Sequence, residues 1–179
     1  MIQLIKMPAK KISYDSSRQR DKEKVVKYIC IHNTGNKGDT AVNNGKFFQN
    51  GNTRQAGAHF FIDQEGVIVR SIPMNRTAYA VGGAKYKDGG TLYNIATNSN
   101  SVSIELCDIV DKEPSEKMIK ALKELISYIQ KYCPNAKDII RHYDVTGKPC
   151  PQRYVDDKEW NKFLAKIKNK KKGGEKKND

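Results

Sequence analysis

The feature that most restricts the fold of this chain is a change of hydrophobic period that follows the segment NSNSVSIELCDIV. In that segment Val102, Ile104 and Leu106 alternate with Ser103 and Glu105, which is the two-residue period of a β-strand with two different faces. In the next segment, PSEKMIKALKELISYIQKYC, apolar residues return every three or four positions, as on the packed face of a helix. A strand followed by an amphipathic helix predicts an α/β fold, with helices packed on a sheet.

Other segments extend this pattern along the chain. VVKYICIHNT predicts a buried strand with His32 at its carboxyl end, and DIIRHYDV predicts another short strand. GAHFFIDQEGVIVRSI predicts a hairpin around a Gln-Glu-Gly turn. GDTAVNNGKFFQNG predicts a short helix that is capped by Asp39 or Thr40 and ends at Gly51, and DDKEWNKFLAKIKN predicts a terminal helix. The long Gly-rich stretch from Tyr79 to Tyr93 predicts the wall of a site.

Length and charge set the domain organisation. The chain has 179 residues, enough for one domain, and its 33 basic and 20 acidic residues give a net charge of +13. The basic residues concentrate at both ends, so we expect a basic N-terminal segment (1–23), a catalytic domain (24–168) and a charged linker or disordered tail (169–179). The charge favours polyanions such as nucleic acid, anionic membranes or anionic wall polymers. No helix-turn-helix, zinc-finger or RNA-binding pattern occurs, so we expect no specific nucleic-acid site.

The sequence also bears on location. No apolar run approaches the roughly 20 residues that span a bilayer, so we expect no transmembrane segment. Lysines interrupt the start, MIQLIKMPAKK, which therefore lacks a signal-peptide core. We expect synthesis in the cytoplasm without a signal peptide, and export by another route.

The loop RHYDVTGKPCPQRY concentrates reactive side chains, with His142, Lys148 and Cys150 close together. A disulfide, a structural metal or a catalytic metal could each use them. The chain has four cysteines, and without a signal peptide they are expected to be reduced. Three of them lie among apolar residues and are expected in the core, namely Cys30, Cys107 and Cys133. Cys150, by contrast, lies in a polar loop between two prolines.

His32 and His142 both end predicted strands, and with Cys150 they offer three ligands of the kind that zinc favours. Three protein ligands leave a fourth position open, as in catalytic sites, whereas a fourth residue would close a structural site. Glu105 could serve as a general base near such a metal, or it could be an edge-strand glutamate facing solvent. Lys148 could stabilise an oxyanion, or it could be a surface charge.

Four motifs occur in a fixed order, IHNTG, GAHFFID, NSNSVSIELC and RHYDVTGKPCP. Together they resemble the zinc-dependent N-acetylmuramoyl-L-alanine amidases, the amidase-2 group of phage endolysins and bacterial autolysins, which is similar to the peptidoglycan recognition proteins. The resemblance spans about Lys24 to Trp160. It implies a mixed central β-sheet flanked by helices, with zinc in a surface cleft.

By the same resemblance, His32, His142 and Cys150 are zinc ligands, and Glu105 and Lys148 are the catalytic pair. The implied reaction is hydrolysis of the amide between N-acetylmuramic acid and L-alanine of the stem peptide by zinc-activated water, which lyses bacterial cell walls.

One position departs from the family pattern. Many relatives carry a catalytic tyrosine directly before the histidine of the second motif, and here that residue is Ala58. We therefore assign its role to Glu105, as in the endolysins that carry a glutamate in the NSxSxE strand. For His59 we expect a structural or supporting role rather than direct catalysis.

Three functions follow as hypotheses, and an amidase is the first. The second is a peptidoglycan-binding sensor that does not cleave; its relatives lack the ligand cysteine, so Cys150 favours the enzyme. The third is a basic nucleic-acid-binding domain with a structural zinc site that a fourth residue, such as Cys107, closes. For the enzyme we expect action on the bacterial wall after release, with peptidoglycan and anionic wall polymers as partners. The lysine-rich end could be the start of a linker to a C-terminal wall-binding domain that is not in this chain, or the basic surface could let a catalytic domain work without a separate anchor.

Overall fold

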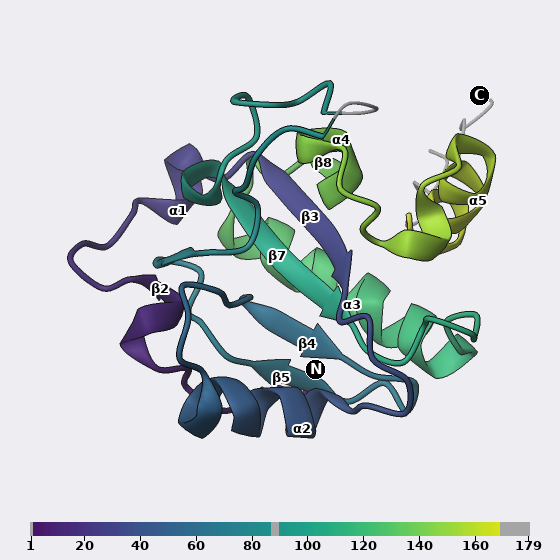
Figure 1. Cartoon of the computed structure of the whole chain (residues 1–179), viewed down its shortest axis with the longest axis horizontal. Coiled ribbons are helices and arrows are strands. Elements are labelled where there is room, and N and C mark those ends of the chain that lie inside the picture. The colour runs from purple at the N-terminus through teal and green to yellow at the C-terminus, as the bar shows by residue number, and fades with distance from the viewer. Residues whose placement is uncertain (1, 87–89, 169–179) are drawn as a thin grey trace, which may run out of the picture.

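The computed structural model describes residues 2–86 and 90–168, and these residues form one mixed six-stranded sheet (Figure 1). The strands are, in order across the sheet, β1 (Ile5–Lys6), β5 (Ile68–Arg70), β4 (Phe60–Ile62), β7 (Ser101–Leu106), β3 (Tyr28–Asn33) and β8 (Asp138–Arg141). Only β4 and β5 pair antiparallel, and every other neighbouring pair in this sheet is parallel. The predicted tail, 169–179, lies outside the described residues.

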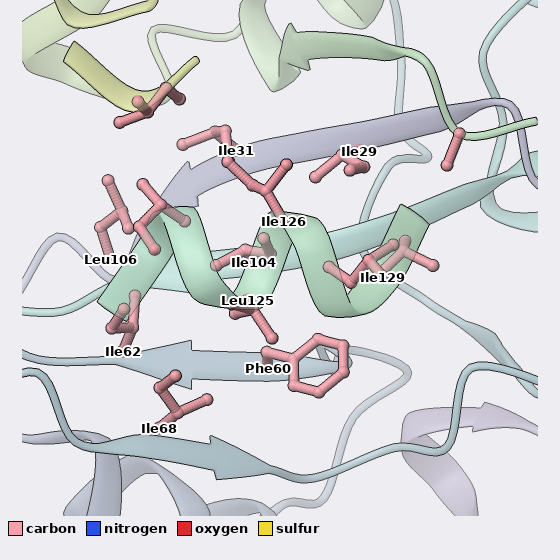
Figure 2. Packing of buried hydrophobic residues seen from close by; sticks show 14 of the residues in the cluster. Ile29, Ile31, Phe60, Ile62, Ile68, Ile104, Leu106, Leu125, Ile126 and Ile129 are labelled. Carbon is pink, nitrogen blue, oxygen red and sulfur yellow. The ribbon is translucent and has the colours of Figure 1, made fainter. Parts of the chain in front are cut away.

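One face of the sheet carries the main hydrophobic core. The long helix α3 (Glu116–Tyr132) passes behind β7 in Figure 1, and α5 (Asp157–Ile167) packs on α3. Figure 2 shows Leu125 and Ile126 of α3 against Ile31 and Ile104 of the strands. Fully burying a side chain of this size stabilises the fold by about 1.5–3 kcal/mol. The apolar face of α3 therefore covers the sheet, as the amphipathic pattern of its sequence predicts.

The opposite face carries a shorter helix. α2 (Ala41–Lys46) continues directly into the π-helix η2 (Phe47–Gly51) and packs on β4 and β5. Thr40 caps α2 by accepting a hydrogen bond from the Asn43 amide, which confirms one of the two predicted caps. Small and apolar side chains join this helix to the sheet: Ala41, Ala58, Phe61, Val69 and Cys107.

Short elements complete the fold. These are α1 (Lys22–Val25), α4 (His142–Thr146), the 3-10 helices η1 (Lys11–Ser13), η3 (Asn98–Asn100) and η4 (Gln152–Tyr154), and the antiparallel pair β2 (Tyr14–Asp15) and β6 (Thr77–Ala78). No helix of the described segments has both the length and the apolar character needed to cross a membrane.

The predicted strand DIIRHYDV is wrong in its second half. The strand ends at Arg141, and His142 begins the helix α4. The cause is local, because the Asp144 carboxylate accepts a hydrogen bond from the Arg141 amide at 2.7 Å and caps the helix start. His142 therefore lies at the junction of a strand and a helix rather than within a strand.

The N-terminal segment, expected to be a basic region outside the domain, packs against it. β1 pairs with β5, and β2 pairs with β6. Arg20 donates hydrogen bonds to the carbonyl oxygens of Met74, Asn98 and Ser101. Several residues before position 24 therefore make specific contacts with the sheet and its loops.

Candidate metal centre

The sheet register places His32 next to Glu105. β3 and β7 run parallel with these two residues directly opposite each other, and Phe61 of β4 is opposite Glu105 on the other side. Side chains alternate between the faces of a strand. The three side chains therefore form one row on the α2 face, near the carboxyl ends of their strands. Open sheets commonly bind ligands outside these ends.

The structure brings His142 and Cys150 to His32. Each of the three residues offers one ligand atom, and these atoms all lie within 4.8 Å of one another. The Cys150 Sγ is 3.8 Å from the His32 Nδ1, and the two imidazole rings are 4.8 Å apart at 63°. All three residues are buried. The residues predicted from strand ends and a loop therefore form one cluster.

The donors of this cluster suit zinc. A tetrahedral zinc ion separates its nitrogen and sulfur ligands by roughly 3.5 Å, close to the distance found here. The Nε2 atom of His142 is buried and has no hydrogen-bond partner, which is costly unless another group such as a metal ion satisfies it. Burial lowers the pKa of both imidazoles, that of His142 to about 4. Both rings are therefore neutral near pH 7, the form that binds metal.

The thiol of Cys150 is the third donor of the cluster. Burial raises the pKa of Cys150 to about 12, so the thiol keeps its proton unless a cation binds nearby. A zinc ion favours the thiolate strongly enough to remove that proton. The predicted fourth ligand of a structural site, Cys107, is not in this cluster among residues 2–86 and 90–168. Cys107 packs under α2 instead, where its Sγ lies 3.5 Å from the side-chain nitrogen Nδ2 of Asn44.

Backbone and ionic contacts hold segment 142–150, formed by α4 and the loop after it, which carries two of the three donors. The Tyr143 amide donates to the Cys150 carbonyl at 2.8 Å and joins the start of α4 to the loop. Arg141 is buried and pairs with Asp144 at 2.6 Å and with Asp157 at 2.8 Å. The same guanidinium donates to two carbonyl oxygens that follow the loop. His142 and Cys150 are thus fixed relative to each other before a metal binds.

The cluster opens into a cleft of about 650 Å³. Glu105 and Lys148 also line this cleft, as the sequence predicts for a catalytic pair. Glu105 Oε2 is buried without a hydrogen-bond partner. Burial raises the pKa of Glu105 to about 7, the charge of Lys148 opposes this rise, and Asp39 adds to it. A carboxyl group with such a pKa can accept and release a proton near neutral pH.

His59 and Ala58 lie outside the cleft that contains the donor cluster, Glu105 and Lys148. His59 Nδ1 accepts a hydrogen bond from the Ser103 amide at 3.0 Å, and Nε2 lies 3.1 Å from the Arg76 carbonyl and 3.0 Å from the Arg20 guanidinium. Within the described ranges, neither His59 nor Ala58 lines the cleft. These contacts join the start of β4 to β7 and to the loop after β5.

Several cleft residues have no strong signal in the sequence. Asp39, Asn43 and Phe47 line the wall formed by α2 and the π-helix, and the sequence predicts only a short helix there. Tyr79, from the predicted wall segment, lines the cleft and also a second hollow of about 400 Å³. Of the predicted wall segment, Tyr79 and Ala80 line the cleft, whereas Val81, Gly82, Gly83 and Tyr93 line the second hollow and residues 87–89 lie outside the described residues. The predicted wall is therefore confirmed only at its start, and α2 with its π-helix forms another side of the cleft.

Known sequences resemble the chain over most of its length. The sequence model of a family described as N-acetylmuramoyl-L-alanine amidase matches residues 21–153. The N-acetylmuramoyl-L-alanine amidase XlyB of Bacillus subtilis (strain 168) is 30% identical over 151 residues, which are 83% of this chain and 44% of that protein. A probable N-acetylmuramoyl-L-alanine amidase of Bacillus licheniformis is 32% identical over 165 residues, 88% of this chain and 44% of that protein. The chain spans less than half the length of these relatives.

Solved structures share the fold. The catalytic domain of XlyA has a TM-score of 0.70 and 21% identity, with 93% of this chain and 100% of that chain covered. PlyL has a TM-score of 0.71 and 21% identity, with 94% of this chain and 98% of that chain covered. At this identity the likeness concerns the fold alone, and it confirms the predicted mixed sheet flanked by helices.

Proposed function

Because this chain belongs to the N-acetylmuramoyl-L-alanine amidase family, we propose that it hydrolyses the amide between N-acetylmuramic acid and L-alanine of the stem peptide. The observation that carries the proposal is the convergence of His32, His142 and Cys150 at the floor of a cleft that Glu105 and Lys148 also line. The substrate is bacterial peptidoglycan, and the place of action is the cell wall. Anionic wall polymers are a second partner that suits the net charge of +13.

We assign the metal to zinc, held by the two imidazoles and the thiolate. When bound, zinc would supply Lewis-acid polarisation of the scissile carbonyl and would acidify the attacking water. The unpartnered Nε2 atom of His142 and the 3.8 Å between the His32 Nδ1 and the Cys150 Sγ support this assignment. Asp39 lies at the edge of the same cleft but is engaged elsewhere, since its oxygens accept from the Asp108 amide and the Asn44 side chain.

The protein's own residues carry the proton transfers. Glu105 accepts the proton of the water whose oxygen attacks the carbonyl carbon, and it delivers this proton to the amide nitrogen as the C–N bond breaks. The products are the lactyl carboxylate and the free amino group of L-alanine. Lys148 places a positive charge in the cleft, where it stabilises the negative charge that develops on the carbonyl oxygen.

Product analysis on purified peptidoglycan tests this function. We expect new amino groups on L-alanine and no new reducing sugar ends, and we expect a zinc chelator to abolish the reaction. Glu105→Gln is the matched control, because it keeps the size of the side chain and all three metal donors but cannot act as a base. Sedimentation with the wall without any new amino groups would instead identify a binding module that does not cleave.

A further inference from the structure

The cleft wall formed by α2 and the π-helix carries an aromatic ring that the proposed chemistry does not use. Phe47 lines the cleft and is 46% exposed, although phenylalanine is among the residues most often buried. We propose that this wall binds the glycan part of the substrate, with Phe47 as the platform for an N-acetylated pyranose ring. The inference rests on the proposed function and deepens it, since it names the part of the substrate that this side of the cleft takes.

The Phe47 ring is held in place by its neighbours. It lies edge-to-face against Phe48 at 5.1 Å and 85°, and Phe48 stacks on Phe61 at 5.2 Å and 24°. The ring also packs over Gly51, where a Cβ atom would lie 3.1 Å from it. These contacts link an exposed ring to Phe61, which neighbours Glu105 in the sheet. The ring is therefore a supported surface at a fixed distance from the catalytic floor.

An unused carboxamide lies on the same wall, and a second one lines the cleft from the loop before α2. Asn43 precedes Phe47 by four residues, so both side chains lie on one side of the helix. Within residues 2–86 and 90–168, the side chains of Asn43 and Asn36 have no hydrogen-bond partner, and both residues are exposed and line the cleft. Asn44 differs, because its amide group donates to Asp39 and to the Thr40 carbonyl. Two amide groups are thus free to donate to a ligand and to accept from it.

An apolar ring beside uncharged amides matches the chemistry of a sugar. The C–H face of a pyranose packs on an aromatic ring, and its hydroxyl and acetamido groups need donors and acceptors such as carboxamides. The carboxylates of a stem peptide instead favour cations, and the cationic residues that line the cleft are Arg54 and Lys148. The part of the wall formed by Asn43 and Phe47 therefore suits the uncharged glycan better than the peptide.

A peptide-free sugar tests the proposal directly. The probe is the β-1,4-linked tetramer of N-acetylglucosamine, which has acetamido groups but no carboxylate that could bind the metal. It is titrated into the zinc-loaded full chain by calorimetry or NMR. Covering roughly 50 Å² of the ring, at about 25 cal/mol per Å², corresponds to about tenfold in affinity. We therefore expect Phe47→Ala to raise the Kd about tenfold and Phe47→Tyr to restore it.

The control variant is Tyr132→Ala, which removes another exposed aromatic ring, on α3 and outside the residues that line the cleft. It should leave the Kd unchanged, and Asn43→Ala should raise it. If the tetramer does not bind, or if Phe47→Ala binds it as well as the native chain does, the proposal is overturned even when peptidoglycan is cleaved. If binding of the tetramer depends on Phe47 but peptidoglycan gives no new L-alanine amino groups, the proposed glycan site is supported and the proposed amidase function is refuted.

Discussion

Replacing His59 with Gln should remove a large part of the acid sensitivity of this fold. His59 is 1% exposed, and burial together with the nearby Arg20 lowers its pKa to about 3. In the unfolded chain the pKa of a histidine is about 6.5. The unfolded state therefore binds more protons than the native state between these two values, and stability must fall as the pH falls through this window.

The size of the effect follows from the two pKa values. At pH 5 the imidazole of His59 is mostly protonated in the unfolded chain but not in the native one. This pH lies about 1.5 below the unfolded pKa, and each pH unit contributes about 1.36 kcal/mol, so His59 lowers the free energy of unfolding by about 2 kcal/mol. At pH 7 the same cost is close to zero. Glutamine keeps an acceptor for the Ser103 amide and a donor for the Arg76 carbonyl but does not titrate.

Urea unfolding of the zinc-loaded proteins at pH 7 and pH 5 measures this difference. When the pH falls from 7 to 5, the free energy of unfolding of the native chain should drop by about 2 kcal/mol more than that of His59→Gln. The other titrating groups, including His32 and His142, are present in both proteins and cancel. An equal drop in the free energy of unfolding for the two proteins would refute the inference that His59 stays neutral in the folded state at pH 5.

Three further variants test the site and its support. Lys148→Ala removes a charge that lowers the pKa of Glu105, so the acid limb of the pH profile of kcat/KM should move to higher pH; an unmoved limb would contradict the assigned base. Cys150→Ser replaces a soft donor and should weaken zinc binding about tenfold or more, as measured by metal analysis after dialysis against a weak chelator. Arg141→Met leaves Asp144 without its buried partner and should lower the free energy of unfolding, measured with urea, by about 3 kcal/mol. A decrease below about 1 kcal/mol would show that the contacts of Arg141 contribute little to stability.

The donor cluster and the core could be predicted because both depend on short, strong patterns. The two-residue period around Glu105 separates the α3 face of β7 from the cleft face, and the structure keeps this separation. His32 lies at the carboxyl end of a predicted strand, and in the fold it is the second-last residue of β3. A strand in a parallel sheet presents its last residues at the edge where ligands bind, so placement at strand ends was enough to bring the histidines together.

Features that depend on distant partners could not be predicted. β1 has only two residues, and it is a strand because Ile5 and Lys6 pair with Val69 and Arg70. No local pattern marks such a pairing, and the lysines nearby predict a solvated end instead. The helix start at His142 did carry a signal, the carboxylate of Asp144 three residues after Arg141, but the β-branched residues around it favour a strand. The π-helix at Phe47 has no marker of its own.

The row formed by His32, Glu105 and Phe61 has an evolutionary consequence. The three residues share one face because their strands are in register, and the side-chain period of a strand is two. Inserting or deleting a single residue within β7 would turn Glu105 toward α3 and bring Ile104 into the cleft, so the proposed base and the core would be disrupted together. Descendants of this sequence can therefore change length only in connections such as residues 110–114, while the strands accept substitutions alone.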